Sequence, residues 1–334
     1  MTSLPDSEPV PTVDDIRAAA ACLRGQAVQT PLLESAALNA RLGGRLLVKA
    51  EGLQRTGSFK FRGAYNKLHG LAPAARARGV VAYSSGNHAQ GVAAAAQILG
   101  VKATIVMPAD APRMKIDNTE GFGASVVLYD RVGEDRRAIA EAIAAREGAT
   151  LVPPFDDAAI MAGQGTVGLE IADQLDAMGA TADAVLVPCC GGGLTAGIAT
   201  AAEALMAGTT VHAVEPRGFD DTARSLAAGE RVRNAGPESG FCDALLTPTP
   251  GELTFAVNRR LVAGGLVVDD DEVRSAMAAA FTYLKIVVEP SGAVALAAAL
   301  SGSYEIRDKT VVAVASGGNV AGDVFCAALS ATGG

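Results

Sequence analysis

The most constraining feature of the sequence is a regular alternation of short apolar runs with longer helix-like segments. Runs rich in β-branched residues begin near Val80, Thr104, Val126 and Leu151, at spacings of 24, 22 and 25 residues. Each spacing accommodates one strand and one crossover helix, the unit from which parallel sheets are built. The sequence therefore predicts an α/β fold with a parallel, doubly wound sheet.

A second alternating series occupies the C-terminal half. It runs from ADAVLVP through a helix after Gly193, the strand VHAVEP and a helix near 223–229 to the strand VVAVAS near Val311. Before that last strand, the acidic stretch 269–271 suits a helix N-terminus. Apolar residues recur behind it at helical spacing and predict a helix, namely Val273, Met277, Ala280, Phe281 and Leu284.

The length of the chain agrees with two such domains, because 334 residues correspond to about two units of roughly 150 residues. We expect a discontinuous large domain of residues 1–78 and 153–334, and a small domain of residues 79–152. The N-terminal helix and the strand RLLVKAE could belong to either domain by pattern alone. We assign them to the large one.

Composition and charge exclude several classes of function. Lys and Arg total 28 against 36 Asp and Glu, a net charge of −8, which argues against binding nucleic acid or an anionic membrane. The uncharged stretches 79–101 and 184–202 are interrupted by polar residues and glycines, so neither predicts a membrane span. The acidic, Pro-rich N-terminus is not a targeting signal, so we expect a cytoplasmic protein with a small-molecule partner.

The cysteines give no sign of a metal centre or of disulfides. None of the five forms a C-x-x-C pair or another metal-ligand spacing, and a cytosolic chain of this size does not need disulfide bonds. We expect all of them to be buried thiols, namely Cys22, Cys189, Cys190, Cys242 and Cys326. Cys189 and Cys190 are adjacent, so a redox pair is an alternative to two small residues in a tight turn.

The segment VPCCGGGLTAG is the most informative turn in the sequence. An apolar strand ends at Pro188, three glycines follow, and a helix begins near Leu194. Backbone amides at a helix N-terminus, with no Cβ in the way, form a site for a phosphate or another anion. The pattern is not that of a dinucleotide or nucleoside triphosphate loop. The alternative is that the glycines only allow close packing of strand and helix.

Lys60 lies between two aromatic residues in GSFKFRGAYNKL, at the start of an amphipathic helix. It is either a surface residue with a buried stem or a partly buried amine, whose pKa burial would lower. A buried amine can form a Schiff base. Together with a phosphate cradle, such a lysine supplies the two anchors that pyridoxal phosphate requires.

Eight motifs occur in an order that resembles a known family. They are GSFKFRGA, SSGNHAQGVA, PFDD with AGQGTVGLEI, PCCGGGLTAG, VEP with FDD, CDALLTPTPGELTF, VEPSGAVALAA and VASGGN. From about Val13 to Asn319 the chain resembles the fold-type II, tryptophan synthase beta-like pyridoxal phosphate enzymes. It is similar to the branch that contains serine/threonine dehydratases (ammonia-lyases) and serine racemase.

The resemblance implies roles for the cofactor-binding residues. Lys60 matches the lysine that carries the cofactor, Phe59 the residue that packs on its ring, and Asn87 the side chain that binds its 3′-oxygen. The phosphate loop corresponds to Gly191, Gly192, Gly193 and Leu194, preceded by Cys190, where the family usually has Gly or Ser. Ser316 matches the partner of the pyridine nitrogen. Because a hydroxyl can donate to an unprotonated nitrogen, the ring is a weaker electron sink, and β-elimination is favoured over transamination.

The resemblance also implies substrate and metal residues. The loop that holds the substrate carboxylate is expected to contain Ser84, Ser85, Asn87 and His88. Ser85 matches the second acid/base of the racemase, although it can equally be a helix-capping hydroxyl. A divalent cation, Mg²⁺ or Ca²⁺, is expected between Glu215, the Phe219 carbonyl and Asp221. The alternative for these two acids is a solvated polar turn.

These observations predict a pyridoxal phosphate-dependent dehydratase that acts on L-serine or L-threonine and releases a 2-oxo acid and ammonia. The alternatives are an amino acid racemase and a 3-hydroxyaspartate dehydratase. Arg136, or its neighbour Arg137, matches a racemase arginine on the distal side of the substrate. A non-catalytic sensor would require loss of Lys60 or of the phosphate loop, and both are intact. We also expect a homodimer, and a catabolic or specialised enzyme without a C-terminal regulatory domain.

Overall fold

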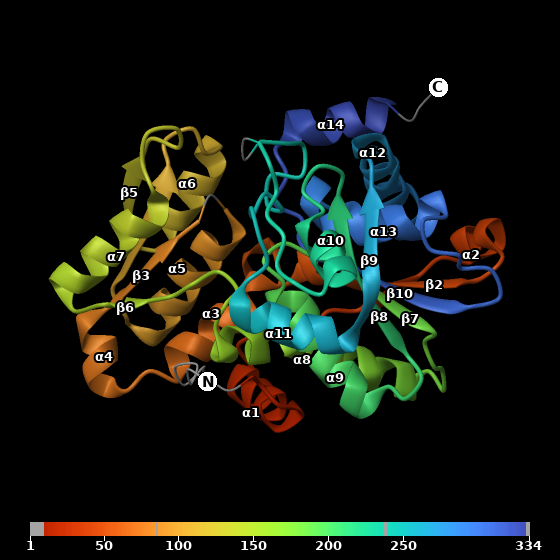
Figure 1. The fold of residues 1–334 in the computed structure, drawn as a ribbon, viewed down its shortest axis with the longest axis horizontal. Coiled ribbons are helices and arrows are strands. Elements are labelled where there is room, and N and C mark those ends of the chain that lie inside the picture. Colours follow the sequence, from red (N-terminus) through yellow and green to blue (C-terminus); the bar gives the residue numbers. More distant parts are fainter. Residues whose placement is uncertain (1–9, 85, 237–238, 332–334) are drawn as a thin grey trace.

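The computed structural model describes residues 10–84, 86–236 and 239–331, which fold into two α/β lobes (Figure 1). The smaller lobe contains a four-stranded sheet in the order β5-β4-β3-β6, with every pair parallel. Its strands are β3 (Val80–Tyr83), β4 (Ala103–Pro108), β5 (Ser125–Tyr129) and β6 (Thr150–Leu151). Its helices are α5 (Asn87–Leu99), α6 (Arg113–Gly121) and α7 (Arg136–Glu147). The predicted strand starts are confirmed to within one residue.

The larger lobe is built on a six-stranded sheet in the order β1-β2-β10-β7-β8-β9. Its strands are β1 (Leu32–Glu34), β2 (Arg45–Ala50), β7 (Ala184–Pro188), β8 (Thr210–Pro216), β9 (Val262–Val268) and β10 (Thr310–Ala315). All pairs are parallel except β1, which pairs antiparallel with β2. The predicted α/β class with parallel sheets is confirmed, with this one antiparallel edge strand as an addition.

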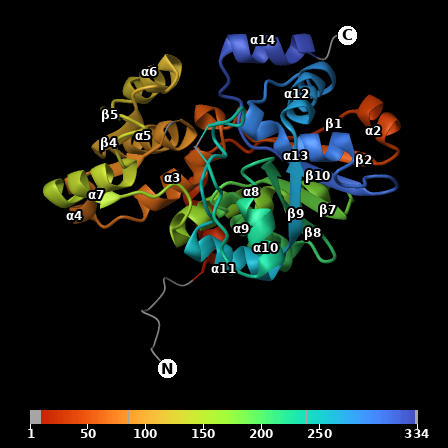
Figure 2. The same cartoon turned by 45° about the horizontal axis from the view of Figure 1, so that its top comes forward.

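Helices cover both faces of the larger sheet (Figure 2). The helices of this lobe are α1 (Val13–Leu23), α2 (Ala36–Leu42), α8 (Ala158–Ala177), α9 (Gly193–Leu205), α10 (Asp221–Ala228), α11 (Glu252–Leu261), α12 (Asp270–Ala279), α13 (Pro290–Ser301) and α14 (Gly322–Ala331), and some of them, such as α1 and α14, pack on other helices. Two short 3₁₀ turns, η1 (Glu51–Leu53) and η2 (Arg55–Gly57), follow β2. Among the described residues, no helix is long and apolar enough to cross a membrane.

Helix α3 (Lys60–His69) lies at the junction of the lobes, and α4 (Pro73–Arg78) follows it (Figures 1 and 2). Phe61 and Leu68 of α3 share one buried cluster with Val80 and Ala93 of the smaller lobe, while α3 also packs on α8. The first residue of α3 is therefore held from both sides. The domain boundaries after residues 78 and 152 remain a proposal.

Two expectations about apolar residues need correction. Helix α12 ends at Ala279 and continues as a single π-helical turn, η3 (Ala280–Leu284). Phe281 lies in this turn and is 47% exposed, with its ring edge-on to that of Phe325. Of the five cysteines, all free thiols, only Cys189 and Cys242 are buried. Cys326 is exposed because it lies on α14, which has a single buried residue.

Candidate active site

Lys60 opens helix α3 with its side chain directed at the segment that follows β6. Its Nζ donates to the carbonyl of Pro154 at 2.7 Å and lies 5.2 Å from the ring centroid of Phe59. Burial of the ammonium group lowers the pKa of Lys60 to about 8. About a tenth of the amine is therefore neutral and nucleophilic at pH 7, far more than for an exposed lysine.

The glycine loop between β7 and α9 forms a cradle of free backbone amides. Helix α9 starts at Gly193 without a side-chain cap, and Gly192 has φ 95°, a conformation that favours glycine. A Cβ at Gly192 would lie 2.6 Å from Asn258 Nδ2, and one at Gly191 would clash with the ring of Phe155. Only glycines fit here, and the uncapped helix N-terminus suits a phosphate group.

One short segment connects the lysine to this loop. Pro154 accepts the hydrogen bond from Lys60, and the next residue, Phe155, packs against Gly191 and Gly193. Cys190 lies close enough for its charge to affect the pKa of Lys60. The structure thus brings the predicted lysine and the predicted phosphate loop into one site.

Ser316 and Asn87 complete the group of predicted cofactor-binding residues. Ser316 follows β10 and is buried, and its carbonyl accepts from the Phe59 amide at 3.1 Å. Asn87 is the first residue of α5; its Oδ1 accepts from Asn319 Nδ2 at 2.8 Å, and its Nδ2 donates to Glu289 Oε1. Residues of both lobes therefore meet at the site.

Glu289 is a site residue that the sequence analysis missed. It is buried, and its Oε2 has no hydrogen-bond partner. Burial, and next in the same direction the charge of Asp243, raises the pKa of Glu289 to about 7, although Lys115 opposes this shift. The motif VEPSG contained the signal, since a carboxylate between an apolar run and a helix-starting proline is unusual.

The predicted substrate loop is only partly described, because Ser85 lies outside the described residues. Ser84 Oγ accepts from the Gly86 amide at 3.1 Å. His88 Nε2 is 3.0 Å from the Val152 carbonyl and its Nδ1 has no partner. Burial, reinforced by the nearby charge of Lys60, lowers the pKa of His88 to about 3, so the imidazole is neutral and its Nδ1 is a free acceptor.

The two predicted distal arginines lie at the start of α7. Arg137 is exposed and pairs with Glu141 at 2.7 Å along the helix. Arg136 is half-buried, and its charge, like that of Arg137, lowers the pKa of Tyr83 against the larger effect of burial. Arg136 is thus the less exposed of the two arginines, although the charge of Arg137 has the larger effect on Tyr83.

The predicted metal residues lie between the end of β8 and the start of α10, next to the strand end that precedes the phosphate loop. Glu215 is fully buried at the end of β8, and its carboxylate accepts from the Thr222 and Ala223 amides at 2.9 and 2.7 Å. Burial and then the charge of Asp221 raise the pKa of Glu215 well above its ordinary value. Asp221 Oδ2 is buried without a partner. Two buried carboxylates that raise each other's energy fit a divalent cation, with the Phe219 carbonyl in the same turn.

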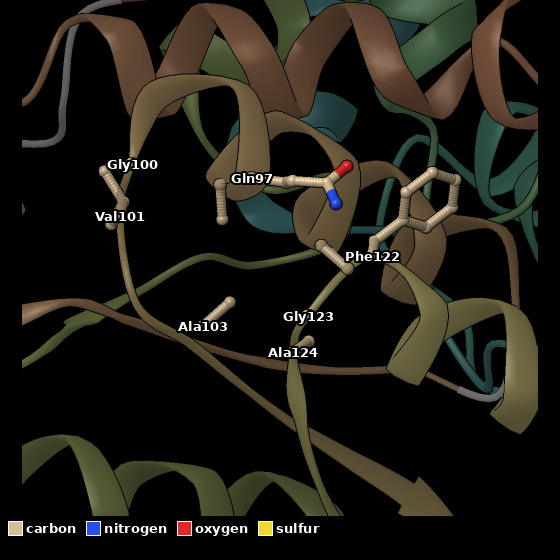
Figure 3. A pocket seen from close by; sticks show the side chains of 9 residues that line it. Gln97, Gly100, Val101, Ala103, Phe122, Gly123 and Ala124 are labelled. Carbon is tan, nitrogen blue, oxygen red and sulfur yellow. The ribbon is translucent and has the colours of Figure 1, made fainter.

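Figure 3 shows a different cavity, of about 190 Å³, between α5, α6 and the strands β4 and β5. Its lining contains no titratable side chain and consists of Ala93, Ala96, Gln97, Gly100, Val101, Ala103, Phe122, Gly123 and Ala124. Such a lining offers no acid, base or nucleophile, so the chemistry belongs to the site around Lys60.

The buried amine and the uncapped glycine cradle together are the two anchors of a pyridoxal phosphate enzyme. A family model described as pyridoxal-phosphate dependent enzyme matches residues 23–317, and the chain belongs to that family. The residues at the site fit the cofactor, which the family implies: the cradle would receive its phosphate and Lys60 its aldehyde.

The chain is similar to three proteins over most of its length. An L-threo-3-hydroxyaspartate ammonia-lyase of Saccharomyces cerevisiae is 41% identical over 311 residues, which cover 93% of this chain and 94% of that protein. A serine racemase of Schizosaccharomyces pombe is 38% identical and covers 94% and 96%. A solved threonine deaminase from T.th. superposes with a TM-score of 0.87 at 45% identity, covering 93% of this chain and 99% of that one.

Proposed function

We propose that this enzyme is an ammonia-lyase that removes water from a small L-3-hydroxy amino acid and releases a 2-oxo acid and ammonia. The observation that carries the proposal is the buried amine of Lys60, connected through Pro154 and Phe155 to an uncapped glycine loop. The similarity to an ammonia-lyase and to a threonine deaminase supports release of ammonia as the outcome of the reaction.

Different residues of this chain are assigned to proton removal and to substrate binding. Lys60, with a pKa of about 8, is a suitable base for the proton on the α-carbon of the substrate. Ser84 precedes helix α5 and the neutral His88 lies in its first turn, at the segment that we assign to the substrate carboxylate. Water lost from the substrate returns when the released enamine hydrolyses, so the net products are the 2-oxo acid and ammonia.

Bound pyridoxal phosphate supplies an electron-withdrawing ring that makes the α-proton acidic. Ser316 offers this ring a hydroxyl rather than a carboxylate, which limits how well negative charge is stabilised. Loss of the β-hydroxyl soon after the proton is then the favoured course. Elimination is therefore the proposed main activity, and racemisation, with Ser85 as second acid/base, a side activity.

The experiment is a panel of substrates with two variants. The purified enzyme is given L-serine, L-threonine, L-threo-3-hydroxyaspartate and D-serine, and 2-oxo acid release is measured. Lys60→Ala should remove activity, and borohydride should fix the cofactor on Lys60 in the wild type only. Lys285→Ala, at an exposed lysine, is the control. Cofactor fixed on Lys285, or no 2-oxo acid from any L-substrate, contradicts the proposal.

The hydroxyaspartate alternative is kept because of the 41% identical yeast ammonia-lyase. A β-carboxylate on the substrate would need a cation on the distal side of the site, where the half-buried Arg136 is the candidate. Preference for L-threo-3-hydroxyaspartate over L-serine that Arg136→Met removes would support this substrate. A preference that survives in Arg136→Met would assign it to another residue.

We also propose that Glu215, the Phe219 carbonyl and Asp221 hold Mg²⁺ or Ca²⁺. Ion binding to the native state alone stabilises it, so either ion should raise the melting temperature and chelation should lower it. Asp221→Asn should abolish the response, whereas Asp173→Asn, a change on helix α8, should not. Equal melting curves with chelator and with added ion would contradict the site.

A homodimer in the cytoplasm is the proposed state of the enzyme. Three apolar residues in or beside η1 and η3 are strongly exposed, with Leu53 52%, Phe281 47% and Val287 46% exposed. A Cβ on Gly52 would lie 3.4 Å from the Val287 carbonyl oxygen, so the segments that carry Leu53 and Val287 are neighbours, and exposed apolar side chains that lie close together are typical of a subunit interface. Phe281→Asp should convert a dimer to a monomer in sedimentation; an unchanged mass would place the interface elsewhere.

A further inference from the structure

Two hydrogen-bond routes lead from the carboxylates of Glu215 and Asp221 to the start of the phosphate loop. The first route passes through Thr222. The Thr222 amide donates to Glu215 Oε1 at 2.9 Å, and the Thr222 hydroxyl lies 3.5 Å from the Cys190 carbonyl. The same hydroxyl is 3.4 Å from the thiol of Cys189. This route ends on the backbone of Cys190.

The second route passes through the loop between α10 and α11 and has shorter bonds. Asn234 Nδ2 donates to Asp221 Oδ1 at 2.6 Å and lies 3.2 Å from the Thr247 carbonyl. The thiol of Cys190 donates to Thr247 Oγ1 at 2.7 Å. Arg224 donates to Asn234 Oδ1, which fixes the amide with its NH₂ group towards Asp221.

Both routes therefore converge on Cys190, the residue directly before Gly191. The second one depends on a side chain at position 190, since a glycine there would have nothing to offer Thr247. The charge of Lys60 acts on the same thiol, whose pKa burial raises and the hydrogen bond with Thr247 then lowers. Cys190 thus touches the cofactor site on one side and the carboxylate pair, through Thr247 and Asn234, on the other.

We propose that cation binding at Glu215 and Asp221 and cofactor binding at the phosphate loop are coupled, with Asn234, Thr247 and Cys190 as positioning residues. The inference rests on the proposed cation site and on the proposed cofactor role of the loop. A cation that orders Asp221 also orders Asn234 and Thr247, and through them the loop residue Cys190. The second ligand then binds to a site that is already ordered, so its binding no longer includes the free-energy cost of ordering that site. Coupling of this kind is reciprocal.

The experiment measures cofactor retention by the holoenzyme in equilibrium dialysis, with saturating Mg²⁺ or with a chelator. The wild type should hold pyridoxal phosphate about tenfold more tightly with Mg²⁺, a typical size for coupling between two sites. Calorimetry with Mg²⁺ should show the same factor in cation affinity between the holoenzyme and the cofactor-free enzyme.

The variants break the second route at different points. Thr247→Val and Asn234→Ala should reduce the tenfold factor to about twofold or less. Cys190→Ala should do the same, while Cys190→Ser keeps a donor and should restore the factor. Thr249→Val is the matched control, because Thr249 lies in the same loop and donates instead to the Val232 carbonyl at 3.2 Å. It should keep the full factor.

The possible results distinguish failure of the coupling from failure of the cation site on which it rests. If Mg²⁺ raises the melting temperature but leaves cofactor retention unchanged, the cation site stands and the coupling is wrong. If Thr247→Val and Thr249→Val reduce the factor equally, the route through Cys190 is wrong. If neither ion changes the melting temperature, the cation site itself fails, and the coupling with it.

Discussion

Glu289 is the residue whose burial has the clearest consequence for the pH dependence of stability. Its pKa of about 7 arises mainly from burial, opposed by Lys115 and supported by Asp243. The folded protein therefore keeps a proton that the unfolded chain loses near pH 4.5. Stability from this group is complete below pH 4.5 and is lost as the pH rises through 7.

Glu289→Gln should remove that pH dependence. In the cofactor-free protein, the free energy of unfolding should fall by up to about 3 kcal/mol between pH 5 and pH 8, since one pKa unit corresponds to about 1.4 kcal/mol. The variant should show a flatter profile in denaturant titrations. Glu252→Gln, at a side chain that is 82% exposed, is the control and should keep the wild-type slope. A slope that survives in Glu289→Gln would assign the effect to another group.

Sequence patterns located the site residues whose local context is distinctive. Lys60 between two phenylalanines and the glycine run before Leu194 could be found without a structure. Glu289 could not be placed, because its environment depends on Asn87, which is 202 residues away in the chain. The motif VEPSG marks this carboxylate as unusual, but it contains no information about a partner so far away in the chain, so it could not assign Glu289 to the site.

At the scale of elements, helix α8 packs closely against α3 through glycines. A Cβ on Gly163 would lie 2.6 Å from the Cα of Gly63 on α3. Helix α8 is equally close to α9, where a Cβ on Gly197 would lie 2.6 Å from the amide nitrogen of Gly165. The motif AGQGTVGLEI therefore has a packing role: it lets α8 hold α3, whose first residue is Lys60. Close packing thus contributes to the position of the reactive amine.

Gly163→Ala should destabilise the protein by about 1–3 kcal/mol, the usual cost of overpacking a well-packed contact. It should also lower cofactor retention, because α3 must move. Gly121→Ala is the matched control: this helical glycine has no atom within 4 Å of a built Cβ, so its replacement should be neutral or slightly stabilising. Thermal melting of both variants checks the prediction, and equal melting temperatures would refute the packing role.

Strand β9 shows why element prediction from the sequence was incomplete. Its run VAGGLVV contains two consecutive glycines, which weaken a strand pattern. The structure explains one of them, since a Cβ on Gly265 would collide with Ala223 of α10. Glycine is needed at position 265 because helix α10 packs so close to the strand, and nothing in the sequence of the strand itself indicates that contact. The regular strands β3, β4 and β5 needed no such compensation and were predicted correctly.

At the scale of the whole molecule, one ion pair bridges the two lobes beside the site. Lys115 of α6 bonds to Asp243, in the loop after α10, at 2.6 Å. The Lys115 side chain is only 6% exposed, whereas that of Asp243 is 42% exposed. A Cβ on Gly86 would lie 3.3 Å from Lys115 Nζ, so the pair adjoins the loop assigned to the substrate carboxylate.

Asp243→Asn should raise the KM for the amino acid about tenfold, with a smaller effect on kcat. Without the carboxylate, the buried Lys115 ammonium loses its partner and the closed arrangement of the lobes becomes less favourable. A tenfold change corresponds to about 1.4 kcal/mol. Steady-state kinetics with the best L-substrate measures it, and small-angle scattering should show a larger radius of gyration.

The matched control is Asp110→Asn, which breaks the pair between Asp110 and Arg131 at 3.1 Å. Both of its members belong to the smaller lobe, and the Asp110 side chain is 64% exposed, so its loss should change neither KM nor the radius. In Asp243→Asn the buried Lys115 ammonium has no partner. Adding Lys115→Met removes that unpaired charge. The Lys115→Met/Asp243→Asn double variant should therefore be less impaired than Asp243→Asn alone. Additive losses in the double variant would mean that the two residues act independently and that closure of the lobes does not depend on their ion pair.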